Sequence, residues 1–136
     1  MKIFLSIKYH PDHRNRDLIE HITQVLQPHR VTCIARDVEE WGEKKFGSRE
    51  LMQKTFDEID SSDIVVVELS EKGVGVGIEA GYARAKGKPI IAVARRGSEI
   101  SETLKGISRE VFIYQDASVL EKFFRTLITQ INAEVR

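Results

Sequence analysis

A single acidic side chain, Glu79, stands inside the glycine-rich stretch Gly73–Ala83, which reads GVGVGIEAGYA. The stretch follows the apolar run Ile64–Val67 and precedes a segment with the pattern of a helix. Glycines let the backbone adopt positive φ angles and approach a ligand closely. A carboxylate at a helix start is stabilised as the anion by the helix dipole. Glu79 is therefore predicted to be an ionised nucleophile or an anchor for a ligand.

The chemistry that such a carboxylate favours is cleavage of a glycosidic bond. A Glu or Asp can attack the anomeric carbon of a sugar through an oxocarbenium-like transition state. The reaction needs an ionised carboxylate held firmly beside the sugar, and Glu79 at a helix N-terminus would provide one. The residues alone leave a second interpretation open, in which the first helical turn holds Glu79 only because the dipole favours an acid there.

The same stretch also matches a dinucleotide-binding pattern in form. Gly75–Ala80 reads G-x-G-x-x-A after an apolar run. The pattern follows the third predicted strand instead of the first, and Arg95 and Arg96 stand where an acidic residue usually ends the next strand. A tight turn between strand and helix explains the glycines more simply, so no cofactor is predicted.

Two histidines, His10 and His13, have a spacing that would suit one helix face and a metal ion. No carboxylate or third histidine is evident near them in the sequence. We expect a solvated pair beside Pro11 and predict no metal site.

Length and composition limit the classes of protein that these residues can serve. The 136 residues are predicted to form one domain, 1–136. The 21 basic and 21 acidic side chains balance, so no general attraction to nucleic acid polymers or membranes is expected. No apolar run reaches the roughly 18 residues of a membrane span, and the apolar start is too short for a signal peptide. Cys33 is the one cysteine, which indicates a buried, reduced thiol in a cytoplasmic protein.

The order of apolar segments and turn residues predicts strands that alternate with helices. Five apolar, β-branched segments predict the strands Lys2–Ile7, Arg30–Ala35, Ile64–Leu69, Lys88–Arg95 and Val111–Tyr114. Apolar residues at helical spacing predict the helices Arg14–Gln27, Arg49–Asp60, Gly77–Lys86, Ile100–Lys105 and Val119–Ala133. Ser48 is the expected N-cap of the second helix, and Arg36–Gly47 is expected to be irregular.

This alternation predicts an α/β fold, a flavodoxin-like (Rossmann-like) three-layer sandwich with a five-stranded parallel sheet. The simplest strand order is 2-1-3-4-5, which places a switch point between the first and third strands. Ligands bind at such points, at the carboxyl ends of the strands. The two loops expected to form the site are therefore Ser6–Asp12 and Ser70–Gly77.

Two segments together resemble a known family. Ser62–Leu69, an apolar strand headed by Asp63, and the motif Gly75–Ala83 are similar to the nucleoside 2-deoxyribosyltransferase family, especially its deoxynucleoside 5′-monophosphate N-glycosidase branch. The resemblance covers most of the chain, from Lys2 to about Gly106, and its central motif is the specific part. It implies that Glu79 is the nucleophile that attacks C1′ of the sugar.

The resemblance also implies a site for a 5′-phosphate. Ser6-Ile7-Lys8 is similar to the family's Ser-Ile-Arg segment, which binds the phosphate in the monophosphate branch. Ile100–Gly106 is similar to a segment whose serine, here Ser101, reaches a phosphate across a dimer interface. The implied substrate-binding residues are Ser6, Ile7, Lys8, Gly73, Gly75, Gly77 and Ser101. A homodimer or higher homo-oligomer is implied with them.

The sequence departs from the family pattern at the side that would face the base. Thr55 stands where the family usually has an Asp that helps the leaving base, and Gly73 aligns with a serine of the monophosphate branch. Trp41 or Phe46 could stack on a base, although packing within a lid is the simpler role for either ring.

The expected function is cleavage of the N-glycosidic bond of a nucleoside or (deoxy)nucleoside 5′-monophosphate, followed by hydrolysis or base transfer. Two alternatives stay open. The chain could be a nucleotide-binding module that has lost turnover with Thr55, or an NAD-cleaving enzyme that resembles TIR domains.

Overall fold

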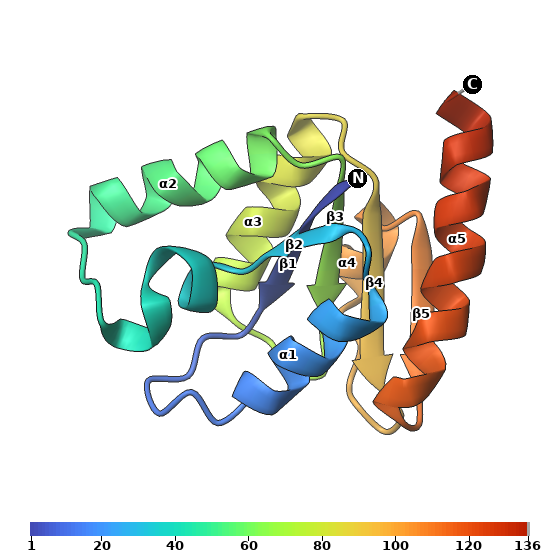
Figure 1. Ribbon diagram of the computed structural model, residues 1–136, viewed down its shortest axis with the longest axis horizontal. Coiled ribbons are helices and arrows are strands. Elements are labelled where there is room, and N and C mark those ends of the chain that lie inside the picture. Colours follow the sequence, from blue (N-terminus) through green and yellow to red (C-terminus); the bar gives the residue numbers. More distant parts are fainter. Residues whose placement is uncertain (136) are drawn as a thin grey trace.

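The structure is a computed structural model that describes residues 1–135, and its centre is one parallel sheet (Figure 1). The strands are β1 (Lys2–Ile7), β2 (Arg30–Thr32), β3 (Ile64–Glu68), β4 (Ile90–Arg95) and β5 (Glu110–Tyr114). Their order in the sheet is β2-β1-β3-β4-β5, and every neighbouring pair is parallel. The predicted fold class and strand order are confirmed.

Helices cover both faces of the sheet, as parallel strands joined by crossovers require. One face packs against α1 (Arg16–Val25) and α5 (Leu120–Val135). The other face packs against α2 (Ser48–Asp60), α3 (Val74–Ala85) and α4 (Glu102–Ile107). The result is three layers, with α2 extending beyond the sheet on the β2 side (Figure 1). No helix within residues 1–135 is long and apolar enough to cross a membrane.

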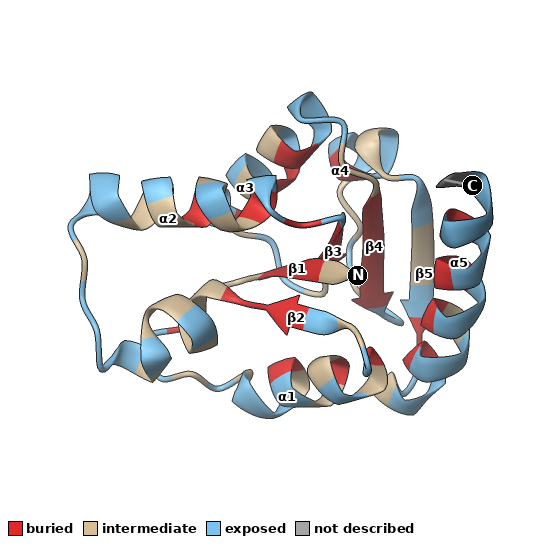
Figure 2. Cartoon of the chain, turned by 45° about the horizontal axis from the view of Figure 1, so that its top comes forward, coloured by how far each residue is buried: buried red, intermediate tan, exposed pale blue. Residues whose placement is uncertain are grey.

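The central strands β3 and β4 are buried along almost their whole length (Figure 2). Their continuous aliphatic residues fit this position, because a strand covered on both faces has no polar side to show. In the β1–β3 register, Ser6 lies beside Val67 and Ile7 beside Glu68. The sheet therefore brings the ends of β1 and β3 to the same edge, at the predicted switch point.

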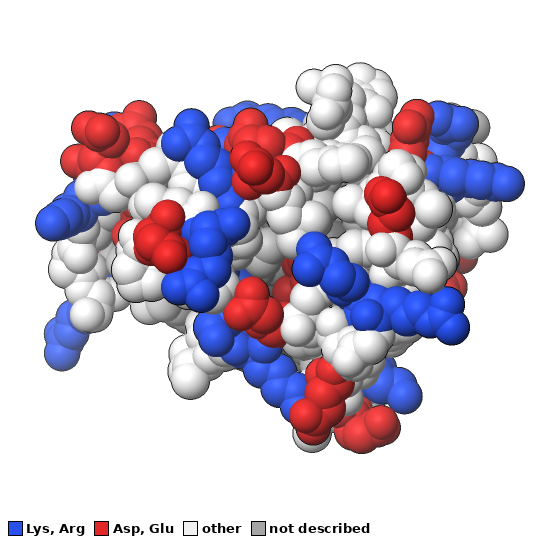
Figure 3. Space-filling view, turned by 90° about the horizontal axis from the view of Figure 1, so that it is seen from below, with Lys and Arg blue, Asp and Glu red and all other residues white. Residues whose placement is uncertain are grey.

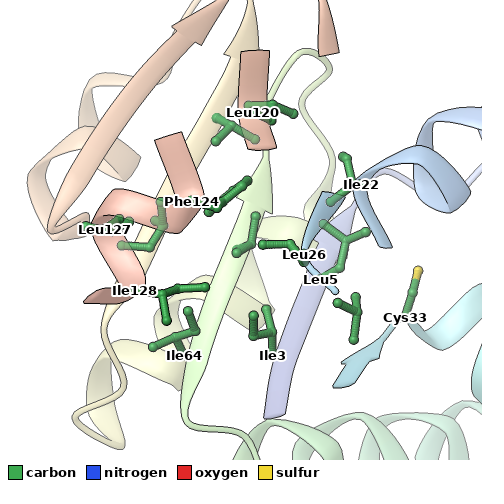
Figure 4. Close-up of a cluster of buried hydrophobic side chains, with 14 of the residues drawn as sticks. Ile3, Leu5, Ile22, Leu26, Cys33, Ile64, Leu120, Phe124, Leu127 and Ile128 are labelled. Carbon is green, nitrogen blue, oxygen red and sulfur yellow. The ribbon is translucent and has the colours of Figure 1, made fainter. Parts of the chain in front are cut away.

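The larger hydrophobic cluster lies between the sheet and the pair α1 and α5 (Figure 4). Leu5 of β1, Ile22 of α1 and Phe124 of α5 meet there with almost no solvent exposure. Cys33 belongs to the same cluster, and burial raises the pKa of its thiol to about 12. The expectation of a buried Cys33 is confirmed, and the raised pKa keeps the thiol protonated and unreactive.

Strand β2 is shorter than predicted, ending at Thr32 instead of Ala35. The chain then forms a wide helical turn over Ile34–Val38 and a tight one over Glu40–Gly42. Asp37 explains the early end of β2. The Cys33 N–H donates to the Asp37 carboxylate over 2.8 Å, so it is not available for the sheet hydrogen bond that a longer strand would need.

Helix ends also differ from the predicted ones by a few residues. Gly47, not Ser48, is the N-cap of α2, and Ser48 is its first residue. Helix α4 begins at Glu102 because the Ser101 hydroxyl accepts the Leu104 N–H and caps it.

Candidate active site

A hydrogen bond between β1 and α3 fixes the carboxylate of the glycine-rich stretch. The Ser6 hydroxyl donates to Glu79 Oε1 over 2.6 Å. Ser6 is fully buried, and its side chain points to the face of the sheet on which α3 packs. The sheet therefore holds one oxygen of Glu79 in a fixed place and leaves the other oxygen without a bond to the described residues.

The glycines before Glu79 do not form the predicted loop. Helix α3 begins at Val74, so Gly75 and Gly77 lie in its first turn, and none of Gly73, Gly75 and Gly77 has a positive φ. A Cβ added at Gly75 or Gly77 would meet nothing within 4 Å. The prediction of positive-φ turns is wrong, and the glycines instead leave the surface of the first turn open for close approach.

The N-terminus of α3 has no side-chain cap. Its N-cap residue is Gly73, and the first backbone bond of the helix runs from the Gly77 N–H to the Gly73 carbonyl. The N–H groups of the first turn before Gly77 therefore have no partner in the described part of the chain. Free N–H groups at a helix start favour an anion such as a phosphate.

The protonation of Glu79 also differs from the expectation. The residue lies in the second turn of α3, beyond the first turn in which the helix dipole acts most strongly. The side chain is half-buried, and this desolvation raises the pKa of Glu79 to about 7. The hydrogen bond from Ser6 lowers the pKa, but by less than burial raises it. Near neutral pH, Glu79 is thus an exchanging acid and not a permanent anion.

Glu79 faces a cavity of about 300 Å³ at the end of β1. Of the residues singled out in the sequence, Ile7, Lys8, Thr55 and Gly75 line it as well. The aliphatic part of the remaining wall comes from β1, α1, α2 and the turn after β2, and the loop after β1 adds Tyr9, His10, His13 and Asn15. A mainly apolar cavity with a few polar groups is typical of a small-molecule site.

Thr55 is in the cavity wall, but its proton is already used. The side chain is 2 % exposed, and its hydroxyl donates to the Leu51 carbonyl at 2.8 Å within α2. Thr55 can therefore accept a hydrogen bond from a ligand but cannot give it a proton without breaking this bond.

The loop after β1 is held by charged contacts to Glu71. Its two oxygens lie 3.1 Å from His10 Nε2 and 3.9 Å from Lys8 Nζ. Asn15 fastens the same loop by donating to the Lys8 carbonyl at 2.8 Å. His10 is only 7 % exposed, so the expected solvated histidine pair is wrong, and the missing carboxylate partner is Glu71.

The histidines do not form a metal site with their neighbours. No group of three or more His, Cys, Asp or Glu side chains suited to a metal ion occurs within residues 1–135. His13 instead packs edge-on against the rings of Tyr9 and Trp41.

A second hollow, of about 610 Å³, adjoins the cavity on the α1 side and shares Ile7, Lys8 and Asn15 with it. Its floor contains Glu68, a buried carboxylate that accepts hydrogen bonds from the Tyr114 hydroxyl and from Ser70. Basic and acidic side chains are mixed on the side of the molecule seen from below (Figure 3). Glu68 is not among the predicted site residues, because in the sequence it reads as part of an apolar strand.

Five residues predicted for the site do not line the cavity of Glu79: Ser6, Gly73, Gly77, Ser101 and Trp41. Ser6 contacts Glu79 through its hydrogen bond. Ser101 lines a separate hollow of about 310 Å³ together with Gly73 and Gly77. Trp41 holds the Arg16 guanidinium 4.6 Å from its ring centroid and contacts His13, with its ring outside the cavity wall. The packing role of Trp41 fits this position better than stacking on a base.

The structure adds Tyr9, His13, Asn15, Glu39 and Met52 to the cavity wall. In the sequence, His13 stands out only through its spacing from His10, and no pattern marks the other four as site residues. Glu39 is the most informative addition, because it is a second carboxylate in the same cavity as Glu79.

Comparisons with known proteins agree on one family. The family model described as nucleoside 2-deoxyribosyltransferase matches residues 7–122. The chain is 27 % identical over 117 residues to a provisionally named 2′-deoxynucleoside 5′-phosphate N-hydrolase 1 of Thermofilum pendens, covering 82 % of each protein. It is 32 % identical over 95 residues to the 5-hydroxymethyl-dUMP N-hydrolase of Danio rerio, covering 63 % of this chain and 66 % of that protein.

A solved structure extends the similarity to the fold. The CMP N-glycosidase of Clostridium botulinum superposes with a TM-score of 0.65 at 19 % identity, covering 93 % of this chain and 99 % of that one. At this identity the likeness concerns the arrangement of the elements alone.

Proposed function

The chain belongs to the nucleoside 2-deoxyribosyltransferase family, whose members cleave N-glycosidic bonds of nucleotides or nucleosides, and we propose that it hydrolyses a 2′-deoxynucleoside 5′-monophosphate with Glu79 as the nucleophile. The observation that carries the proposal is the 2.6 Å hydrogen bond from Ser6 to Glu79 in the wall of the cavity. The bond holds one carboxylate oxygen, while the other oxygen is free to attack.

The proposed first step transfers the sugar to the protein. The free Glu79 oxygen attacks C1′, the bond between C1′ and the base nitrogen breaks, and its electron pair leaves with the base, which takes up a proton from solvent. Only the ionised carboxylate can attack, and its pKa is about 7. The rate kcat/KM is therefore expected to rise with pH through about 7, since this ratio reports ionisations of the free protein.

The preference for a monophosphate is supported by the groups around Lys8. Lys8 lines both the cavity and the adjoining hollow, and its Cγ is 3.5 Å from where a Gly73 Cβ would be. Lys8 is therefore next to the uncapped start of α3. A cation beside free helix N–H groups suits a phosphate dianion. Ser101 lines the hollow that also contains Gly73, and its proposed phosphate contact would come from a second copy.

A second candidate function is nucleotide binding without turnover. The observation that favours it is the hydrogen bond that occupies the Thr55 hydroxyl, because Thr55 then offers no proton to a departing base. Binding of a deoxynucleoside monophosphate without any release of base would select this candidate.

The experiment is incubation with the four common 2′-deoxynucleoside 5′-monophosphates, with free base measured by chromatography. Nicotinamide release from NAD, measured in parallel, tests the NAD-cleaving alternative. Wild type is expected to release base, and Glu79→Gln to lose at least about 10⁴-fold of the rate, as loss of a nucleophile commonly does. Glu50→Gln is the matched control, since Glu50 is exposed on α2 outside the cavity. No base release by wild type, or an unchanged rate for Glu79→Gln, would refute the proposal.

A further inference from the structure

Hydrolysis by a carboxylate nucleophile needs a second proton-handling group. Once the sugar is esterified to Glu79, water must attack C1′, and water is a poor nucleophile until a base takes its proton. That group must face the same cavity as Glu79 and must have a free proton-accepting atom.

Most polar side chains in the cavity are already engaged. The Thr55 hydroxyl is bonded to the backbone of α2, and Lys8 and His10 both contact Glu71. The Cys33 thiol is buried with a pKa of about 12, so its thiolate is not formed. Tyr9 is 54 % exposed, which leaves it largely outside the cavity interior.

Of the two remaining groups, His13 lines the cavity, but its Nε2 atom lies next to Gly42, which is not in the cavity wall. Its Nε2 atom is 3.5 Å from the place of a Cβ on Gly42, and its ring is packed between Tyr9 and Trp41. Glu39 lines the cavity, is only half-buried, and makes no side-chain hydrogen bond or ion pair with any residue in the range 1–135. Among the described residues of the turn after β2, the Glu39 carboxylate is thus the free proton acceptor in the cavity wall.

The backbone around Glu39 is built in an unusual way. Its N–H donates to the Ile34 carbonyl, and its carbonyl accepts from Gly42 and Lys44. The next two residues, Glu40 and Trp41, have positive φ angles of 47° and 56°. Such conformations are costly for side chains other than glycine, and strained backbone of this kind clusters at functional sites. The main-chain bonds hold Glu39 where its side chain reaches the cavity.

We propose that Glu39 is the general base that activates water against the sugar–Glu79 ester, and this proposal rests on the proposed function. The water oxygen forms a bond to C1′ while its proton passes to a Glu39 oxygen. The bond between C1′ and Glu79 breaks, and its electron pair returns to the Glu79 carboxylate. Glu39 then gives the proton to solvent, and the sugar phosphate leaves.

The protonation states of the two carboxylates fit this division. Burial raises the pKa of Glu39 above its ordinary value, and the nearby His13 charge lowers it in part. Glu79 has the larger rise, to about 7. During the second step Glu79 is esterified and does not titrate, so the one carboxylate that must be ionised is Glu39.

The test separates the two steps with Glu39→Gln, which keeps the shape of the side chain. Its steady-state base release is expected to fall by about 10²–10⁴-fold, the usual contribution of a general base. The first turnover remains, so a burst of about one base per protein appears, and the intact mass rises by one deoxyribose phosphate. Azide, which attacks C1′ without a base, restores turnover. Glu40→Gln is the matched control, because Glu40 is the exposed neighbour outside the cavity and should behave as wild type.

The outcomes distinguish this proposal from the proposed function. A wild type without base release overturns both. A wild type that is active and needs Glu79, together with a Glu39→Gln variant within threefold of its steady rate, overturns the role of Glu39 alone. Loss of the burst in both Glu39→Gln and the smaller change Glu39→Asp also overturns that role, because Glu39 would then be needed before the second step.

Discussion

The cavity has two walls that are built by different means. The sheet wall consists of Ser6 and Ile7 at the end of β1, the adjoining Lys8, and Gly75–Glu79 in α3. Regular strand and helix hydrogen bonding places all of these residues except Lys8. The turn wall consists of Ile34–Gly42, which includes a wide helical turn and two non-glycine residues, Glu40 and Trp41, with positive φ. The sheet wall thus offers a rigid, buried position for a nucleophile, and the turn wall offers an unpaired carboxylate on a locally strained backbone.

The largest effect expected in the sheet wall besides loss of Glu79 comes from Ser6→Ala. Without the hydroxyl, Glu79 loses both its orienting bond and the contact that lowers its pKa, so kcat should fall by about 10²-fold. Base release under saturating substrate measures this. Ser62→Ala is the control, since Ser62 is equally buried but bonds the Glu58 carbonyl. Equal losses in both variants would mean that Ser6 acts through stability alone.

The raised pKa of Glu79 predicts a pH-dependent cost to the fold. Between pH 4.5, the ordinary value, and about 7, the folded protein keeps a proton that the unfolded chain has lost. The contribution of Glu79 to stability is therefore present below pH 4.5 and is lost as pH rises to about 7.

Glu79→Gln removes this loss, because glutamine does not titrate. As pH rises from 4.5 to 8, the free energy of unfolding of the variant should increase by about 1–3 kcal/mol relative to that of wild type. This energy is reduced to allow for the partial solvation of the Glu79 side chain. Urea unfolding of both proteins at the two pH values measures the difference. A constant difference across the range would show that Glu79 ionises with its ordinary pKa and is not the more strongly desolvated of the two cavity carboxylates.

A smaller effect is expected where the sheet wall meets the proposed phosphate. Lys8→Ala should raise KM for a monophosphate by about 10-fold, the value of one hydrogen bond to a charged group, and leave KM for the nucleoside unchanged. Lys44→Ala, which removes an exposed lysine next to the turn wall, should change neither. If Lys8→Ala raised KM for the monophosphate and for the nucleoside by a similar factor, Lys8 would not contact the phosphate.

The smallest effect concerns the strain of the turn wall. Glu40→Gly places glycine at a φ of 47°, where it carries no penalty, and should stabilise the protein by about 0.5–1 kcal/mol after the entropy of the more flexible unfolded chain is included. Thermal unfolding measures the change. A destabilised variant would indicate that Glu40 is not strained and that the two walls are more alike than their backbones suggest.

The difference between the walls also explains what the sequence could predict. Five strands and their order follow from repeated apolar patterns. Glu79 stands out through its glycine-rich stretch, and Ser6 and Lys8 through the resemblance of Ser6-Ile7-Lys8 to a family segment. Cavity residues in the turn wall do not repeat, so Glu39 has no pattern to reveal it. The ionisation of Glu79 was misjudged because it depends on burial and on the exact helix start, and the motif fixes neither.

The contacts of Glu71 have a consequence for how a ligand would enter. In the free protein this carboxylate already satisfies His10 at 3.1 Å and lies 3.9 Å from Lys8. Uptake of the proposed phosphate is then an ion exchange, in which an incoming anion replaces one that belongs to the chain. Because few counterions are released from solution in such an exchange, affinity should depend only weakly on salt concentration, unlike that of an open basic surface.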